Sequence, residues 1–118
     1  MLNQIVIMGR LCADPELRYT QTTQKPVVSF RLAVERDREK KTDFISVTAW
    51  NGTAEFVSKY FTKGNMTVVS GRLQIREWTD KNGTKHNEPE IEADHVYFGE
   101  AKAKETKNAF SDLNDLPD

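Results

Sequence analysis

The sequence predicts an all-β fold, a five-stranded barrel with one short helix between the third and fourth strands. Three observations lead to this prediction. Apolar and polar residues alternate along several short segments, as they do in strands that bury one face. A single segment, after Trp50, repeats its apolar residues at helical spacing. Glycine and proline turn signals separate the segments, and 118 residues make one domain of modest size.

The first strand is predicted at residues 3–11, NQIVIMGRL, where apolar residues follow one another almost without a break. Such a strand is covered on both faces. A small domain rarely covers both faces itself, so we expect a second subunit on one of them and therefore a homo-oligomer. Asp14-Pro15 then marks a turn. The second strand, residues 25–35, points Val28, Phe30, Leu32 and Val34 inward, and Ser29 and Arg31 outward.

The third strand is predicted at residues 42–51. Its inward residues are Ile45, Val47 and Ala49, and its outward residues are Phe44, Ser46, Thr48 and Trp50. The segment 35–43, ERDREKKTD, has four basic and four acidic side chains and no apolar anchor, which predicts a mobile hairpin. Its basic residues are candidates for phosphate binding, unless the interleaved acids neutralise them: Arg36, Arg38, Lys40 and Lys41.

The helix is predicted directly after Asn51-Gly52, with Thr53 as its N-cap. Ala54, Val57 and Phe61 share one face at helical spacing. Lys63-Gly64 ends the helix, because a cation and a glycine suit its negative end.

The fourth strand, residues 66–78, turns one set of side chains inward, Val69, Leu73 and Ile75, and another set outward, Arg72, Gln74, Arg76 and Trp78. Gly71 inside it predicts a bulge or sharp bend. Asn82-Gly83 predicts a hairpin that leads to the last strand, residues 90–98. Glu88, Glu90, Glu92 and Asp94 share one parity and are expected on a face away from the arginines, either as a solvated face, as a guarded edge or as a partner surface. This order of elements is that of the OB-fold.

The outward residues of the third and fourth strands indicate a function. Two arginines lead to Trp78, and Phe44 and Trp50 end the neighbouring outward row. Aromatic rings stack on bases and arginines neutralise phosphates, so the pattern predicts a surface for single-stranded nucleic acid. The alternative is that both tryptophans lie in a subunit interface, where aromatics are also enriched.

Composition limits the classes of protein and the cellular compartment to which the chain can belong. Residues 1–99 have 14 Lys and Arg against 13 Asp and Glu, whereas residues 100–118 have 3 against 5, so the tail is acidic. The lone Cys12 fits a reducing cytosol as a buried or interfacial thiol. His86 and His95 are expected to be partly buried structural residues. We predict no metal, cofactor, catalytic grouping, leader or membrane span, hence a cytoplasmic, nucleoid-associated protein that is not an enzyme.

The chain resembles the bacterial-type single-stranded DNA-binding proteins, the SSB family, over about residues 2–98. The resemblance rests on residues 3–11 and on the segment 14–19, DPELRY. The runs 30–34 and 44–50, together with Lys63-Gly64, Gly71-Arg72-Leu73 and Trp78-Thr79-Asp80, also match in type and spacing. It implies an OB-fold in residues 1–99 that forms a homotetramer and wraps single-stranded DNA in replication, recombination and repair. It implies stacking by Phe44, Trp50 and Trp78, and phosphate contacts by Arg10, Arg18, Arg31, Arg72 and Arg76.

The resemblance also implies a flexible acidic tail, residues 100–118, whose tip recruits replication and repair proteins. The candidate tip residues are Asp112, Asp115, Leu116, Pro117 and Asp118. Family members often end in Pro-Phe, and here the terminal phenylalanine is missing, so we expect weakened recruitment. A short tail resembles accessory, phage or mobile-element members, and a basic residue common in the family is absent at Asn51-Gly52. Two other functions stay open: an OB-fold interaction subunit of a primosome or helicase complex, and an RNA-binding OB protein of the cold-shock type.

Overall fold

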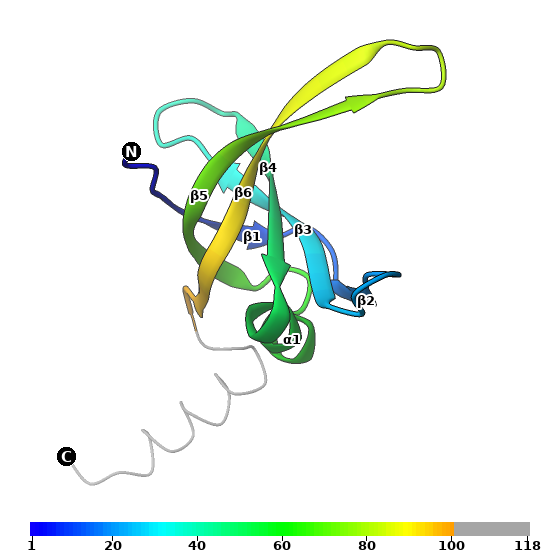
Figure 1. Ribbon diagram of the computed structural model, residues 1–118. Coiled ribbons are helices and arrows are strands. Elements are labelled where there is room, and N and C mark those ends of the chain that lie inside the picture. The colour runs from blue at the N-terminus through cyan, green and yellow to red at the C-terminus, as the bar shows by residue number, and fades with distance from the viewer. Residues whose placement is uncertain (101–118) are drawn as a thin grey trace, which may run out of the picture.

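The computed structural model describes residues 1–100 (Figure 1). The elements are β1 (Ile5–Leu11), β2 (Glu16–Tyr19), β3 (Pro26–Glu35), β4 (Thr42–Trp50), α1 (Asn51–Tyr60), β5 (Met66–Thr79) and β6 (Lys85–Phe98). The all-β prediction, with one helix after the third long strand, is confirmed. There is one strand more than predicted, because the Asp14-Pro15 turn leads into the short β2. The tail, apart from Glu100, lies outside the described residues.

The strands form one sheet that curls into a ring. Its order is β1-β5-β6-β4-β3-β2, and β1 also pairs with β3 through Arg10↔Ala33 and Leu11↔Leu32. All pairings are antiparallel except β4 with β6, which run parallel at Val47↔Ile91. β2 pairs only with β3 and extends the sheet beyond the ring. This is the arrangement of an OB-fold.

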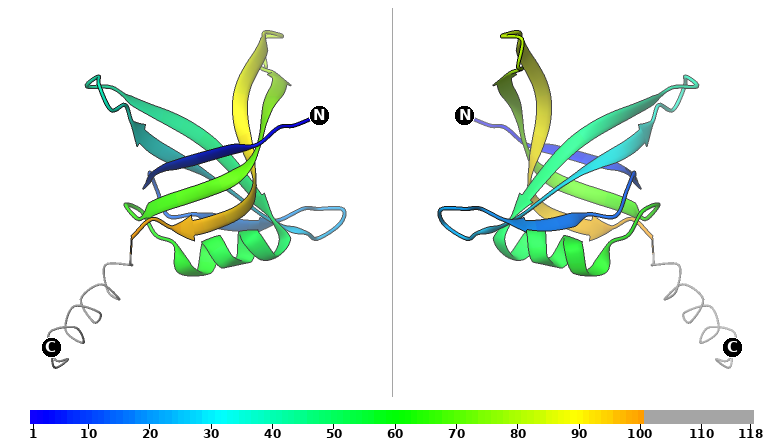
Figure 2. Two further views of the ribbon diagram at one scale, coloured as in Figure 1. Left: turned by 90° about the vertical axis from the view of Figure 1, so that its left-hand side faces the viewer. Right: turned by 90° about the vertical axis from the view of Figure 1, so that its right-hand side faces the viewer.

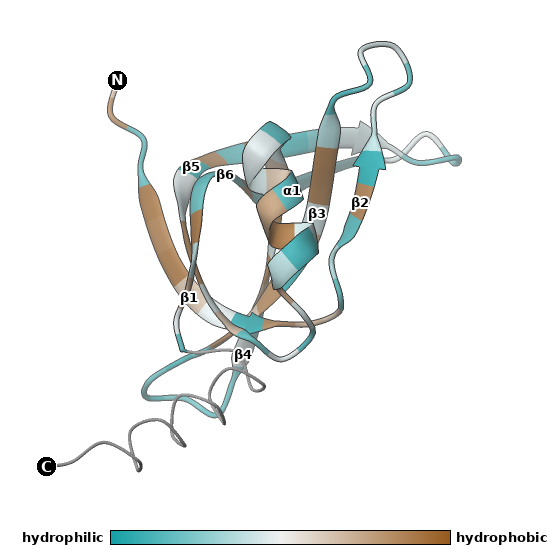
Figure 3. Cartoon of the chain, turned by 90° about the horizontal axis from the view of Figure 1, so that it is seen from below, coloured by the Kyte–Doolittle hydropathy of each residue, from teal (hydrophilic) through white to brown (hydrophobic). Residues whose placement is uncertain are grey.

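The core fills the ring, and α1 closes one end of it (Figures 2 and 3). The predicted inward residues of β3 and β4 are buried or half-buried, since Val28, Leu32, Val47 and Ala49 are at most 1% exposed. The helix face is also as predicted. The core is made of Leu11, Val28, Phe30, Leu32, Val47, Ala49, Ala54, Val57, Phe61, Val69, Ile91, Ala93 and Val96.

The boundaries of α1 differ from the prediction. Trp50, in an extended conformation, occupies the N-cap position without a side-chain hydrogen bond, and Thr53 lies inside the first turn. The Thr53 hydroxyl instead donates to the carbonyl of Asp94, 3.4 Å away. The helix ends at Tyr60, before Lys63-Gly64, because Phe61 turns extended and buries its ring. That ring stacks on Phe98 with 4.1 Å between centroids.

Two hairpins, β3–β4 and β5–β6, project from the ring on the side away from α1 (Figure 2). The longer one, which we call the β5–β6 arm, extends past the core. The prediction that Leu73 and Ile75 are buried is therefore wrong. They share parity with the buried Val69, but they are 42% and 57% exposed because the core ends before them.

A β-bulge marks the base of the arm. Ser70 pairs with His95 and Gly71 pairs with Ala93, so Asp94 is an extra residue on β6. The extra residue reverses the parity of β6, which exposes His95 and buries Val96. The prediction of a partly buried His95 is therefore wrong, whereas His86 is half-buried as predicted. Gly71 sits at the irregularity, as its position inside a strand predicts.

Candidate nucleic-acid interface

Strand register joins the predicted side chains into one surface, which we call the outward face. Val27 pairs with both Arg18 and Trp50, and Ser46 pairs with both Arg31 and Glu90. Gln74 on β5 is then opposite Glu90. Paired residues in neighbouring strands point to the same side of a sheet. The outward face includes Glu16, Arg18, Ser29, Arg31, Phe44, Ser46, Thr48, Trp50, Arg72, Gln74, Arg76, Trp78, His86, Glu88, Glu90 and Glu92.

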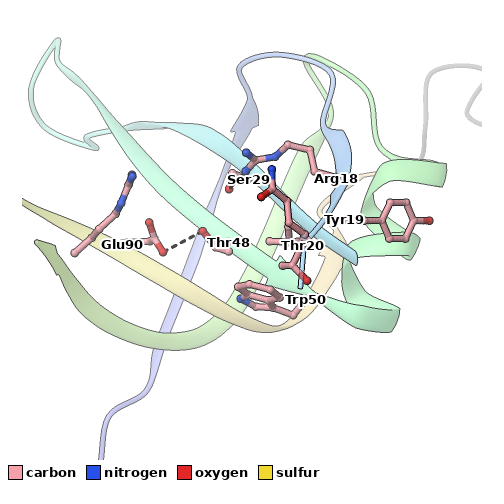
Figure 4. A pocket seen from close by; sticks show the side chains of 10 residues that line it. Arg18, Tyr19, Thr20, Ser29, Thr48, Trp50 and Glu90 are labelled. Atoms are coloured by element: carbon pink, nitrogen blue, oxygen red, sulfur yellow. Dashed lines mark hydrogen bonds between the residues drawn. The ribbon is translucent and has the colours of Figure 1, made fainter. Parts of the chain in front are cut away.

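A groove of about 830 Å³ lies on this face between β2 and β6 (Figure 4). Trp50 lies in it, with Arg18 and Ser29 on the side of β2 and β3. Glu90 lines the other side and accepts a hydrogen bond from the Thr48 hydroxyl at 3.0 Å. Trp50 is 38% exposed, so part of its ring is available for stacking.

The arginines of the outward face are not equally engaged. Arg31 Nη2 lies 3.3 Å from Glu88 Oε1, and Arg72 Nη2 lies 2.6 Å from Glu92 Oε2. Arg18 Nη2 donates to the Ser29 hydroxyl at 3.5 Å. Arg76, which lines the groove, has no carboxylate within 4.0 Å among the described residues. Of the four arginines of the outward face, Arg76 is therefore the most open to a phosphate.

The prediction that the acids lie away from the arginines is wrong. Arg72 is opposite Glu92 and Arg76 is opposite Glu88 in the β5–β6 pairing. The Ser46 hydroxyl donates to Glu88 at 3.0 Å, and this bond, followed by the one from Arg31, holds the pKa of Glu88 below its usual value. Of the four acids predicted to share one face, only Asp94 has no partner on β5, because it is the bulged residue.

Trp78 lies near the tip of the β5–β6 arm and is 42% exposed. Its indole stacks on the His86 ring with 4.3 Å between centroids and 20° between planes. His86 Nε2 in turn donates to Asp80 Oδ2 at 2.8 Å. This bond, followed by the one from the Thr84 backbone N–H, lowers the pKa of Asp80. His86 thus covers one face of the Trp78 indole, and this contact fixes the orientation of the ring.

The remaining predicted phosphate contacts lie away from the groove. Arg10 is in register with Ala33, which pairs with Phe44, but its guanidinium binds the Gly64 carbonyl and Glu100 at 3.0 and 2.9 Å. Arg36 is held by Asp43 at 3.0 Å and by Glu39 at 3.2 Å. Arg38, Lys40 and Lys41 are exposed in the β3–β4 hairpin, and the aromatic residue of that hairpin, Phe44, is 58% exposed.

Sequence reasoning missed the contribution of Tyr19, Thr20 and Gln21 to the groove, because β2 was not predicted. It also missed the mixing of acids and arginines, because the register of the arm depends on the length of its turn. The five-residue turn 80–84 is centred on Asn82, and each cross-strand pair of the arm is equidistant from Asn82 in sequence. Counting outward from a two-residue Asn82-Gly83 turn would have placed Pro89 opposite Arg76, so the pairing of Arg76 with Glu88 follows only from the five-residue turn.

Other predicted features can be placed only in part. No three His, Cys, Asp or Glu side chains within residues 1–100 are grouped so as to hold a metal ion. In the same range no helix is long and apolar enough to cross a membrane. Cys12 is half-buried and unpaired with another cysteine. The candidate tip residues lie outside the described residues: Asp112, Asp115, Leu116, Pro117 and Asp118.

The ring is that of an OB-fold, and its outward face has a groove with partly exposed aromatic and arginine side chains. The profile of the Single-strand binding protein family matches residues 2–99, and the chain belongs to this family. The resemblance seen in the sequence is thereby confirmed.

Individual relatives agree with the family match. The chain is 40% identical over 108 residues to the "Single-stranded DNA-binding protein" of Caldanaerobacter subterraneus, covering 87% of this chain and 71% of the relative. It is 42% identical over 107 residues to the "Single-stranded DNA-binding protein 1" of Staphylococcus aureus, with 86% and 68% covered. It is 35% identical to the "Single-stranded DNA-binding protein" of Thermotoga maritima, with 98% and 86% covered.

Proposed function

We propose that the chain binds single-stranded DNA without catalysis and without sequence preference, and protects it during replication, recombination and repair. The observation that carries the proposal is the outward face, where Trp50 lies in a groove lined by Arg18 and Arg76. Membership of the Single-strand binding protein family supports it. The expected location is the cytoplasm, in association with the nucleoid.

The proposed mechanism combines stacking with charge neutralisation. Bases stack on Trp50, Trp78 and Phe44, each contributing about 1 to 3 kcal/mol. Arginines between and beside these rings contact the phosphates. Every base has a π-face, so affinity depends little on sequence.

Titration with oligothymidine tests the proposal, since both tryptophans belong to the proposed surface. Stacked bases quench tryptophan emission, and salt weakens phosphate contacts by counterion competition. We expect strong quenching at low salt that is reversed by added salt. Unchanged emission with micromolar DNA at low salt would refute the proposed function.

Arg76→Gln should lower affinity and make it less dependent on salt. Removing one phosphate contact reduces the slope of log K against log salt concentration by about 0.7 for a single strand. Titrations at four or five salt concentrations measure the slope. Lys59→Gln removes the same charge from the last turn of α1 and should leave the slope unchanged. Equal slopes for the two variants would show that Arg76 does not contact a phosphate.

The chain is further proposed to act as a homo-oligomer, with a tetramer as the expected state. β1 carries a long apolar stretch (Figure 3), and Val6 and Met8 on it are exposed. Met8 pairs with Val68, and Val68 pairs with the exposed Tyr97, so the apolar surface continues across β5 to β6. A surface of this kind supports association with a second copy.

Met8→Glu is expected to shift the oligomer towards the monomer, because a charge would be buried in the contact. Light scattering with and without a long oligothymidine reports both the subunit number and the wrapping stoichiometry. Thr22→Glu introduces the same charge in the exposed turn between β2 and β3 and should not change the mass. A wild-type monomer, or an unchanged mass for Met8→Glu, would contradict this surface.

The tail tip is the proposed site for replication and repair proteins. Leu116-Pro117 is followed by Asp118 and not by phenylalanine.

A further inference from the structure

Three glutamates of β6 lie on the outward face among the arginines that the proposed function assigns to phosphates. Glu88 accepts hydrogen bonds from Arg31 and Ser46, at 3.3 and 3.0 Å. Glu92 accepts one from Arg72 at 2.6 Å. Each carboxylate thus occupies a position on its arginine that a phosphate oxygen would take.

The glutamates leave the outward face almost neutral. Its four arginines, Arg18, Arg31, Arg72 and Arg76, share the surface with Glu88, Glu90 and Glu92. A surface that binds polyanions through charge alone gains its affinity from uncompensated cations. A phosphate that approaches Arg72 here must displace Glu92 or accept a like charge close by.

Stacking is not affected by this neutralisation. Trp50 and Trp78 remain partly exposed, and a base on either ring contributes regardless of nearby charge. A single strand is flexible enough to place bases on the rings while its phosphates reach Arg76. In a duplex the bases are paired and stacked on each other, so only the phosphates are offered to this face.

We propose that Glu88 and Glu92 determine specificity for single strands, by penalising polyanions that present phosphates without accessible bases. The inference rests on the proposed function and adds to it a mechanism by which single strands are preferred over duplexes. Specificity of this kind comes from repulsion of the wrong ligand as well as attraction of the right one. Every polyanion must displace the same carboxylates, but only a ligand whose bases stack on Trp50 and Trp78 gains enough to offset that modest cost.

The test uses the full chain and the double variant E88Q/E92Q. Glutamine keeps an oxygen acceptor for Ser46 and the arginines but removes the negative charge. Dissociation constants are measured at one salt concentration for oligothymidine, for a duplex of the same length, and for heparin, which has no bases. The single variant E55Q is the control, because it removes an exposed carboxylate from α1. Thermal unfolding checks that every variant is folded.

We expect E88Q/E92Q to bind duplex and heparin about tenfold more tightly, and oligothymidine about threefold more tightly. The preference for single strands should thus fall about threefold. E55Q should change every constant by less than about twofold.

Unchanged duplex and heparin binding would overturn the inference, and so would an equal gain for all three ligands. Weaker oligothymidine binding would overturn it too, because the glutamates would then orient the arginines for DNA. In each of these cases wild-type binding to oligothymidine shows that the proposed function itself survives. A wild-type chain that does not bind oligothymidine at low salt refutes both.

Discussion

Trp50→Ala is expected to weaken oligothymidine binding by about 5- to 150-fold, which corresponds to the loss of about 1 to 3 kcal/mol from one stacked base. Trp50 lies in the groove, is 38% exposed and does not belong to the core cluster, so its removal should affect the ligand without opening the core. Trp78→Ala should have an effect of similar size. Trp78 is supported from behind by His86, and its exposed face is available to a base.

Equilibrium titration measures the affinity of both variants. The signal is the fluorescence anisotropy of a labelled oligothymidine, so the measurement does not rely on tryptophan emission. Trp50→Phe is the matched control, because it keeps an aromatic plane at the same position and should restore most of the affinity. Far-UV circular dichroism and thermal unfolding separate binding from folding. If both alanine variants lose the fold, the tryptophans belong to the core or to an interface. If they stay folded and bind as well as wild type, bases do not stack on these tryptophans.

The alternation of side chains was sufficient to predict the parts of the sheet that pack on the core. In β4, Val47 and Ala49 are buried while Phe44 and Trp50 are exposed, as predicted. This prediction works because the side-chain period of a strand is two and one face must leave water. The same period places Phe44, Trp50, Arg72, Arg76 and Trp78 on the outward face.

Alternation failed where the environment of a strand changes along its length. Leu73 keeps the parity of Val69, but the arm has left the ring and no core remains beneath it. His95 loses the parity of Ala93 because one bulged residue, Asp94, lies between them. Both outcomes depend on tertiary contacts that a single strand does not encode.

The charges were misread for a different reason. Arg76 was predicted on one strand, and Glu88 was assigned only the parity of the next one. Only the register fixed by the turn around Asn82 places them opposite each other. Relative placement of charges in a hairpin therefore needs the turn as well as the parity of each strand.

Gly71→Ala is expected to destabilise the fold by about 1 to 3 kcal/mol, the usual range for overpacking. A Cβ atom at Gly71 would overlap the carbonyl oxygen of Glu92 and lie 2.9 Å from the Cα of Ala93. Both are backbone atoms of the paired strand, so no side chain can rotate away. The strand must separate at the bulge, and the arm that begins there would lose its position relative to the ring.

The loss of stability should be accompanied by weaker DNA binding, because Arg76 and Trp78 follow Gly71 along the arm. Urea unfolding measures the stability change, and oligothymidine titration measures the affinity of the folded protein. Gly52→Ala is the matched control. Gly52 lies in α1 with no atom within 4 Å of an added Cβ, so alanine there should stabilise the helix by about 0.5 to 1 kcal/mol.

A Gly71→Ala protein as stable as wild type would show that β5 and β6 can approach less closely at the bulge without cost. Reduced stability with unchanged affinity would show that the arm keeps its geometry despite the strain, and that Arg76 and Trp78 do not depend on the bulge for their placement.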